Sequence, residues 1–135
     1  MAKKDIRMVP GEVEAFLAAR SGELVTIVAG PEGEAPFGDL ARLGFADGVA
    51  SFRLDARSRV VAELAHDGRV CCIVDQRPFE AAETSYFNTR SAMLHGTARR
   101  VEAARDGEAC FALDIEKVVS FDFAKLQSDP ASQAQ

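Results

Sequence analysis

One segment of the sequence combines side chains and spacing suited to binding an anion. In Arg53-Leu54-Asp55-Ala56-Arg57-Ser58-Arg59, three arginines surround a serine where an expected strand meets an expected helix. Serine is a favoured N-cap, and the first helical turn offers backbone N–H groups at the positive end of the helix dipole. Arginine adds donors that match phosphate oxygens. The pattern predicts a phosphate site formed by Ser58 and its neighbours, with an ordinary capped helix as the alternative.

The histidines and cysteines form no metal-binding pattern, and a nucleophilic Cys-His pair stays open as the alternative to a core position for Cys71 and Cys72. His66 is expected at a helix C-terminus, where the dipole favours a cation, and His95 is expected inside a strand. The sequence therefore predicts no metal site and identifies no catalytic side chain. An odd number of cysteines without Cys-x-x-Cys spacing favours a reducing, cytoplasmic compartment. These cysteines are Cys71, Cys72 and Cys110.

Charge and length limit the function classes. The chain has 135 residues and a formal charge of −5, so we expect one domain that binds neither nucleic acid nor an anionic membrane surface. We expect no transmembrane helix, because no apolar run approaches 18 residues, and no secretory signal at the charged N-terminus. The expected organisation is an N-terminal extension over 1–9, a folded domain over 10–126 and a disordered tail over 127–135.

Hydrophobic periodicity predicts a mostly β protein. Asp47-Gly48 between two strand-like runs is a hairpin signal, and Gly96 inside a long strand suggests a bulge or a barrel corner. The connections favour an antiparallel sheet curled into a barrel with helices outside it. The expected helices cover 10–22 and 58–66, a short helix or connection covers 103–111, and the expected strands cover 24–29, 37–45, 49–54, 70–74, 86–101 and 118–123.

Four stretches, in this order, resemble the FMN-binding split-barrel proteins of the pyridoxamine 5′-phosphate oxidase-like group. They read FLAARSGELVTIVAG, DARSRVVAELAHDGRVCCIVD, RSAMLHGTARRV and VVSFDF. The similarity covers about residues 10–126 and is greater to short members, including nitroimidazole-resistance-like proteins, than to the oxidase. It implies a six-stranded antiparallel split β-barrel, with flanking helices, that forms a homodimer. It also implies one FMN in each of two grooves between the subunits.

The resemblance also implies which residues hold the cofactor. In the Ser-Arg-Lys run that binds the flavin phosphate, Ser58 and Arg59 match, while Val60 replaces the lysine and Arg57 could supply the missing charge. The strand along the isoalloxazine ring corresponds to about 38–43. A glutamine that touches the flavin corresponds to Ser91. The predicted cofactor-binding residues are Arg42, Arg57, Ser58, Arg59 and Ser91.

Three functions remain open at this point. The first is an FMN-dependent oxidoreductase acting on a small molecule over the exposed ring face. The second is a deazaflavin-dependent reductase of the same fold, whose acidic cofactor tail would need an additional basic groove. Arg99, Arg100 and Arg105 could supply it, but either Arg99 or Arg100 should point away, because strand neighbours face opposite sides. The third is a non-enzymatic flavin-binding or haem-binding module. Pyridoxamine phosphate oxidase activity is not expected, because no match to that enzyme's substrate-phosphate residues follows the last strand.

Overall fold

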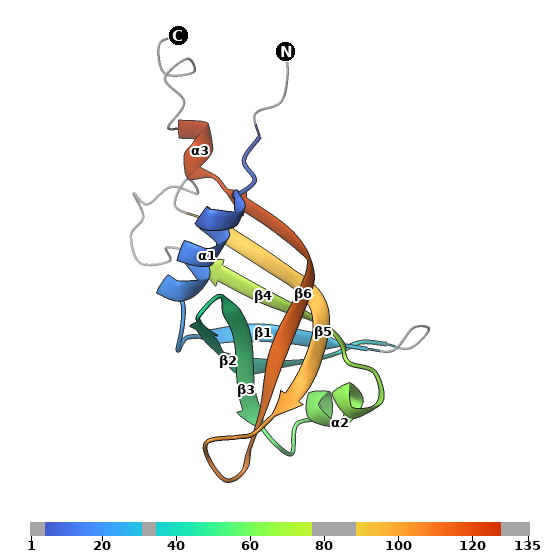
Figure 1. Ribbon diagram of the computed structural model, residues 1–135. Coiled ribbons are helices and arrows are strands. Elements are labelled where there is room, and N and C mark those ends of the chain that lie inside the picture. Colours follow the sequence, from blue (N-terminus) through green and yellow to red (C-terminus); the bar gives the residue numbers. More distant parts are fainter. Residues whose placement is uncertain (1–4, 31–34, 77–88, 128–135) are drawn as a thin grey trace, which may run out of the picture.

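A computed structural model describes residues 5–30, 35–76 and 89–127, which form a closed barrel of six strands (Figure 1). Around the barrel the order is β1-β2-β3-β6-β5-β4, and every neighbouring pair is antiparallel. The expected six-stranded antiparallel barrel with flanking helices is confirmed. The elements are α1 (Pro10–Ala19), β1 (Leu24–Ala29), β2 (Phe37–Ala46), β3 (Val49–Asp55), α2 (Arg59–His66), β4 (Arg69–Gln76), β5 (Arg90–Val101), β6 (Glu108–Asp122) and α3 (Ala124–Gln127).

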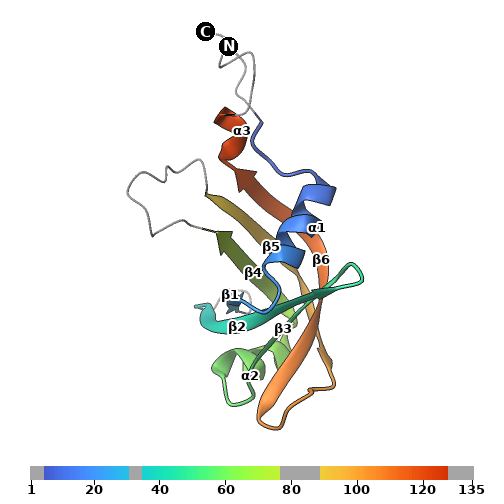
Figure 2. The same cartoon turned by 90° about the vertical axis from the view of Figure 1, so that its left-hand side faces the viewer.

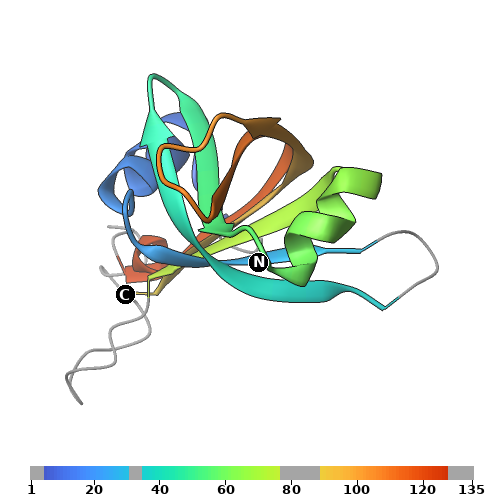
Figure 3. The ribbon, with the colours of Figure 1, turned by 90° about the horizontal axis from the view of Figure 1, so that it is seen from below.

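Two helices cover opposite ends of the barrel, as Figures 1 and 2 show. The first, α1, buries Val13, Phe16 and Leu17. The second, α2, buries Val60, Val61 and Leu64, which share one helical face. It packs on β1 and β2 at the lower end of the barrel in Figure 1, the end that Figure 3 views from below. Among the described residues, no helix has the length and apolar character needed to cross a bilayer.

The expected hairpin at Asp47-Gly48 is confirmed. Its φ angles are 53° at Asp47 and 78° at Gly48, and Ala46 pairs with Val49 across this two-residue loop. Two left-handed residues match the right-handed twist of the flanking strands. The tight loop fixes the register of β2 against β3 and therefore the place of every side chain on β2.

The irregularity expected at Gly96 is also confirmed. The pairing of β5 with β6 shifts between His95 and Gly96. A β-carbon at Gly96 would lie 2.1 Å from the carbonyl oxygen of Asp114. Only glycine allows the two backbones to approach this closely.

The expectation of a short helix or connection over 103–111 is wrong for its second half. The chain turns at Gly107, where φ is +83°, and β6 begins at Glu108. The expected last strand over 118–123 is therefore only the end of β6. The decisive contact is long-range: Phe111 stacks on Phe52 of β3, with ring centroids 5.2 Å apart. The expected strand over 86–101 begins at Arg90, and residues 86–88 and most of the 127–135 tail lie outside the described residues.

Candidate functional site

Ser58 caps α2, as the sequence predicts, but its hydroxyl already has two partners. Its oxygen accepts the backbone N–H of Val60 at 3.2 Å. Its proton is donated to the Asp39 carboxylate, with 2.5 Å between the oxygens. Asp39 lies near the start of β2, which α2 contacts. A hydroxyl has one proton to donate, so the Ser58 proton is committed to a carboxylate.

The backbone donors around this cap are also engaged. The N–H of Arg57 donates to Asp55 Oδ1 at 2.8 Å, and that of Ser58 to the Asp55 carbonyl at 3.0 Å. The N–H of Val61 donates to the Ser58 carbonyl at 3.0 Å. An anion site at a helix N-terminus depends on unsatisfied N–H groups. Here the chain itself satisfies most of them.

Both arginines beside Ser58 are paired with carboxylates. Arg57 makes two hydrogen bonds to Asp55, with Nη2 2.9 Å from Oδ2, while 91% of its side chain stays exposed. Hydrogen bonds from Arg57 lower the pKa of Asp55 to about 2. Arg59 Nε donates to Glu63 Oε1 at 3.1 Å, and its guanidinium lies 4.3 Å from the centre of the Phe37 ring. Each of these cations therefore has an anion within the chain.

Position 60 presents its side chain to the core and not to a ligand. Val60 is 1% exposed and belongs to the apolar face of α2. The family that the sequence resembles has a lysine at this position. In this chain the position is buried in the core, which accounts for the valine. A lysine here would bury its charge among apolar side chains.

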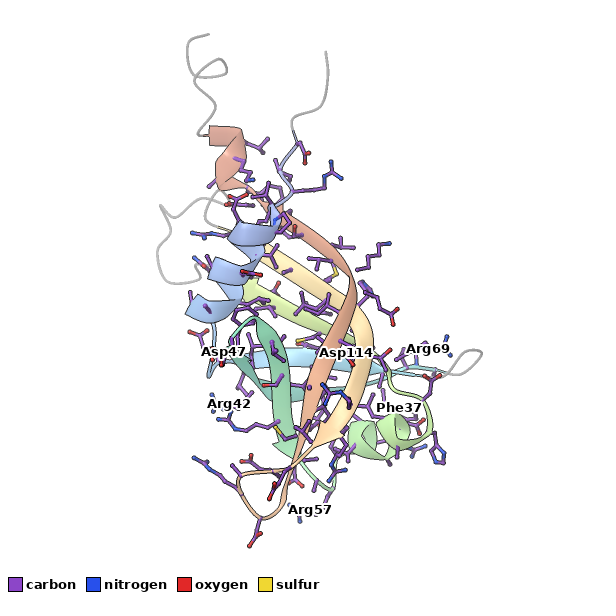
Figure 4. All side chains as sticks on the ribbon, viewed as in Figure 1. Phe37, Arg42, Asp47, Arg57, Arg69 and Asp114 are labelled. Atoms are coloured by element: carbon purple, nitrogen blue, oxygen red, sulfur yellow. The ribbon has the colours of Figure 1, made fainter. Side chains whose placement is uncertain are left out.

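Arg42 lies in a second part of the same region, on the outer face of β2. Its Nη1 donates to the Gly22 carbonyl at 3.1 Å, and in the register it pairs with Arg53 of β3. Both arginines line a hollow of about 340 Å³, here called the outer hollow. Figure 4 shows Arg42 and Arg57 on this lower part of the molecule. The outer hollow is lined by Leu24, Leu40, Ala41, Arg42, Arg53, Leu54, Asp55, Asp106, Gly107 and Glu108.

The outer hollow and the start of α2 form one surface. Asp55 lines the hollow and also holds Arg57, so it joins the two parts. Leu24 and Leu40 lie at the hollow with 53% and 56% of their surfaces exposed. Arg53 Nε lies 3.6 Å from Glu108, a looser pairing than those beside Ser58. The hollow therefore combines exposed apolar surface with two guanidinium groups.

Ser91 lies away from the other predicted residues. It is on β5, three strands from β2 around the barrel in either direction, and it is 3% exposed. Its neighbours in the register are Asp75 and Phe121. Within one chain the structure thus brings Arg57, Ser58 and Arg59 together, places Arg42 on the adjoining surface and leaves Ser91 apart. Ser91 stays a prediction.

The arginines expected for a deazaflavin tail also separate. Arg99 Nε lies 3.7 Å from Asp114, whereas the Arg100 guanidinium lies 5.5 Å from the centre of the Phe111 ring. Adjacent strand residues face opposite sides, so one basic groove does not receive both. Arg105 lies in the turn before β6.

Sequence reasoning missed two contributors to this region, Asp39 and Phe37, and did not place Arg53 in the outer hollow. Neither Asp39 nor Phe37 belongs to a recognisable local motif. Asp39 reaches Ser58 across 19 positions of sequence, a contact that exists only because α2 folds back on β2. Arg53 was part of the arginine-rich segment, but its place beside Arg42 depends on the hairpin register.

A larger hollow, of about 550 Å³, lies under α1 and contains none of the predicted residues. Its lining is mainly apolar and includes Val13, Leu17 and Val118. Size alone would favour this α1 hollow as a ligand site. The outer hollow is smaller, but it carries the paired guanidinium groups.

Comparison with known proteins supports the fold and leaves the function open. No family model matches the chain, and no curated protein matches it. A conserved hypothetical protein, Rv2991 of Mycobacterium tuberculosis, superposes with a TM-score of 0.73 at 17% identity, covering 96% of this chain and 94% of that one. A FAD-binding protein of Mesorhizobium loti matches with a TM-score of 0.64 at 13% identity, over 84% and 93% of the two chains.

A haem storage protein, HutZ of Vibrio cholerae, matches about as well. Its TM-score is 0.63 at 13% identity, and the match covers 84% of this chain and 96% of that one. Likeness at such identities establishes a shared fold. The split-barrel fold implied by the sequence resemblance is confirmed in this way. The choice between flavin and haem is not decided by it.

Proposed function

We propose that this chain is a flavin-binding protein whose isoalloxazine ring lies in the outer hollow. The observation that carries the proposal is the pair Arg42 and Arg53 beside exposed Leu24 and Leu40 in one hollow. Leucine side chains pack on the faces of a planar ring. Guanidinium groups near the ring's carbonyl edge stabilise the negative charge that a reduced flavin carries. The sequence resemblance and the shared barrel support the same assignment.

The second part of the proposal is that two copies of the chain enclose the ring. Two large apolar side chains, Leu24 on β1 and Leu40 on β2, are exposed on the outer faces of neighbouring strands and line the same hollow. Exposed apolar side chains that gather at one hollow are typical of a surface that a ligand or a partner covers. A homodimer would cover the outer hollow and exclude water from the ring.

The region around Ser58 does not fit the phosphate of FMN. The Ser58 proton is used by Asp39, Arg57 is held by Asp55, Arg59 is held by Glu63, and Val60 is buried. A phosphate there would have to displace carboxylates from their hydrogen bonds. We therefore assign the ring to the outer hollow and no phosphate to the start of α2.

We propose that the protein acts as an oxidoreductase on a small molecule. A bound flavin would supply hydride or electron transfer. Within this chain, Arg42 and Arg53 would hold the ring and favour its reduced form, and the apolar side chains would exclude water. Two of the three carboxylates that line the hollow, Asp55 and Glu108, are paired with Arg57 and Arg53, and the third is Asp106. The proposed reaction rests on the ring itself.

Titration of the purified protein with riboflavin tests the proposal. Flavin fluorescence should be quenched saturably, and thermal stability should rise with flavin concentration through ligand linkage. Arg42→Ala should weaken binding at least tenfold with little loss of stability, because this arginine is on the surface. Arg99→Ala, which removes an arginine from the outer face of β5, is the matched control and should bind as the parent does.

Other cofactors give different results in the same assay. A Soret band from added haem with no flavin quenching would overturn the proposal in favour of a haem module. An increase in thermal stability with a deazaflavin and not with riboflavin would favour a deazaflavin-dependent reductase. Unchanged flavin affinity in the Arg42→Ala variant would show that the ring lies elsewhere.

A further inference from the structure

We infer that Asp39 is a specificity-determining residue that selects a flavin without a terminal phosphate over FMN. The carboxylate takes the place at the start of α2 that a phosphate would need. The preference among flavins rests on the proposed function. The exclusion of phosphate from this helix end does not, and it can be tested without a flavin.

The hydroxyl of Ser58 donates a short hydrogen bond to the Asp39 carboxylate. At 2.5 Å it is at the short end for a hydroxyl donating to a carboxylate. The same hydroxyl accepts from the Val60 N–H, so Asp39 is connected to the helix cap through Ser58. Negative charge near a helix N-terminus is stabilised by the dipole. Asp39 therefore supplies from within the chain the anion that this position favours.

The charge balance around the cap opposes a second anion. Two guanidinium groups, from Arg57 and Arg59, face three carboxylates, from Asp39, Asp55 and Glu63. A phosphomonoester carries a charge of about −1.5 to −2 at neutral pH. A phosphate that replaced Asp39 at Ser58 would remain close to its carboxylate. Riboflavin has the same ring and ribityl chain without this charge and avoids the repulsion.

The burial of Val60 removes the remaining route to a phosphate site. Its side chain belongs to the core, so the first turn of α2 gains no cation from that position. Arg59 could release Glu63, but the Ser58 proton would still be donated to Asp39. Removal of the Asp39 side chain, which takes away both the charge and the acceptor of the Ser58 proton, is thus the change that should open the site.

The experiment compares riboflavin and FMN affinities in the parent, in Asp39→Ala and in Asp39→Asn. The parent should bind riboflavin about tenfold more tightly than FMN. Asp39→Ala frees the Ser58 proton and should tighten FMN binding at least tenfold with riboflavin affinity unchanged. Asp39→Asn keeps an acceptor for Ser58 and removes only the charge, so it should give a smaller gain. The preference of the parent should shrink at high salt.

Asp47→Asn is the matched control. It removes the same charge from the same hairpin, about 25 Å further along the strand at ~3.3 Å per residue, well beyond the screening length. Asparagine tolerates the left-handed φ of 53° at that position. The riboflavin-to-FMN ratio should be that of the parent.

Inorganic phosphate is the second probe and requires no flavin. Amide NMR signals of residues 59–61 should not shift saturably with phosphate in the parent, and should do so in Asp39→Ala. Failure of every variant to bind flavin would refute the proposed function, while the phosphate titration would still decide the role of Asp39. A parent that binds FMN as tightly as riboflavin, or an Asp39→Ala variant without gain for FMN or phosphate, would overturn the inference.

Discussion

Gly96→Ala should be among the most damaging single-methyl additions to this barrel. The new β-carbon would lie 2.1 Å from the Asp114 carbonyl oxygen, 2.9 Å from its carbon and 3.0 Å from Ile115 Cα. All three are backbone atoms of β6, so no side chain can rotate away. Relief requires the two strands to separate by about 1 Å or more. We expect a cost of about 3–4 kcal/mol from overpacking and weakened ladder hydrogen bonds.

Two other glycines, Gly44 and Gly11, have less crowded surroundings and serve as comparisons. At Gly44 a β-carbon would lie 2.6 Å from Ser51 Oγ, which can rotate, so alanine should cost about 1 kcal/mol. At Gly11 in α1 a β-carbon would meet nothing within 4 Å, so alanine should stabilise the protein by about 0.5 kcal/mol. The same chemical change should therefore have three different outcomes.

Urea unfolding at a fixed protein concentration is the assay. With an m-value of about 1.5–2 kcal/mol per M, Gly96→Ala should lower the midpoint by about 2 M, Gly44→Ala should lower it by about 0.5 M, and Gly11→Ala should raise it slightly. Equal midpoints for Gly96→Ala and the parent would refute the close approach of β5 and β6 at the bulge.

Three further outcomes follow from the same structure. Arg57→Gln should raise the pKa of Asp55 from about 2 toward its ordinary 3.8 in a carboxyl NMR titration, because the side-chain hydrogen bonds from Arg57 are lost. In the parent the pair contributes stability above pH 3.8, and this contribution is lost as the pH falls toward 2. Arg69→Gln is the control and should leave the pKa of Asp55 unchanged. Iodoacetamide at pH 8 should modify Cys72 only after unfolding, since burial raises its pKa to about 12, and mass spectrometry reads this directly. Val60→Lys should lower stability by about 3 kcal/mol in urea unfolding without creating phosphate affinity, because it buries a charge.

Much of the fold could be predicted because its signals are local. The strand over 24–29, the hairpin at Asp47-Gly48 and the bulge at Gly96 each follow from a short pattern of residue types. The start of β6 could not be predicted in this way. Residues 108–113 become a strand because Phe111 packs on Phe52, almost sixty positions earlier, and no local pattern reports that contact.

In the candidate site, too, the local features could be predicted from the sequence and the long-range contacts could not. The cap at Ser58 is local and was predicted correctly, and the arginines around it were identified from spacing. Their partners were not. Whether Arg57 and Arg59 serve a ligand or the chain depends on Asp55 and Glu63, and the fate of the Ser58 proton depends on Asp39, which only the folding of α2 on β2 brings near. The local sequence pattern identifies the hydrogen-bond donors, and the tertiary structure determines which acceptors they contact.

The most direct test of the central claim is an amide NMR titration of the protein with riboflavin. We predict saturable shifts on both sides of the outer hollow, at residues 40–43 of β2 and 53–55 of β3, with the same dissociation constant as fluorescence quenching. Shifts concentrated on Val13, Leu17 and Val118 would place the ligand in the α1 hollow instead. That result, or a spectrum that riboflavin leaves unchanged, would contradict the account.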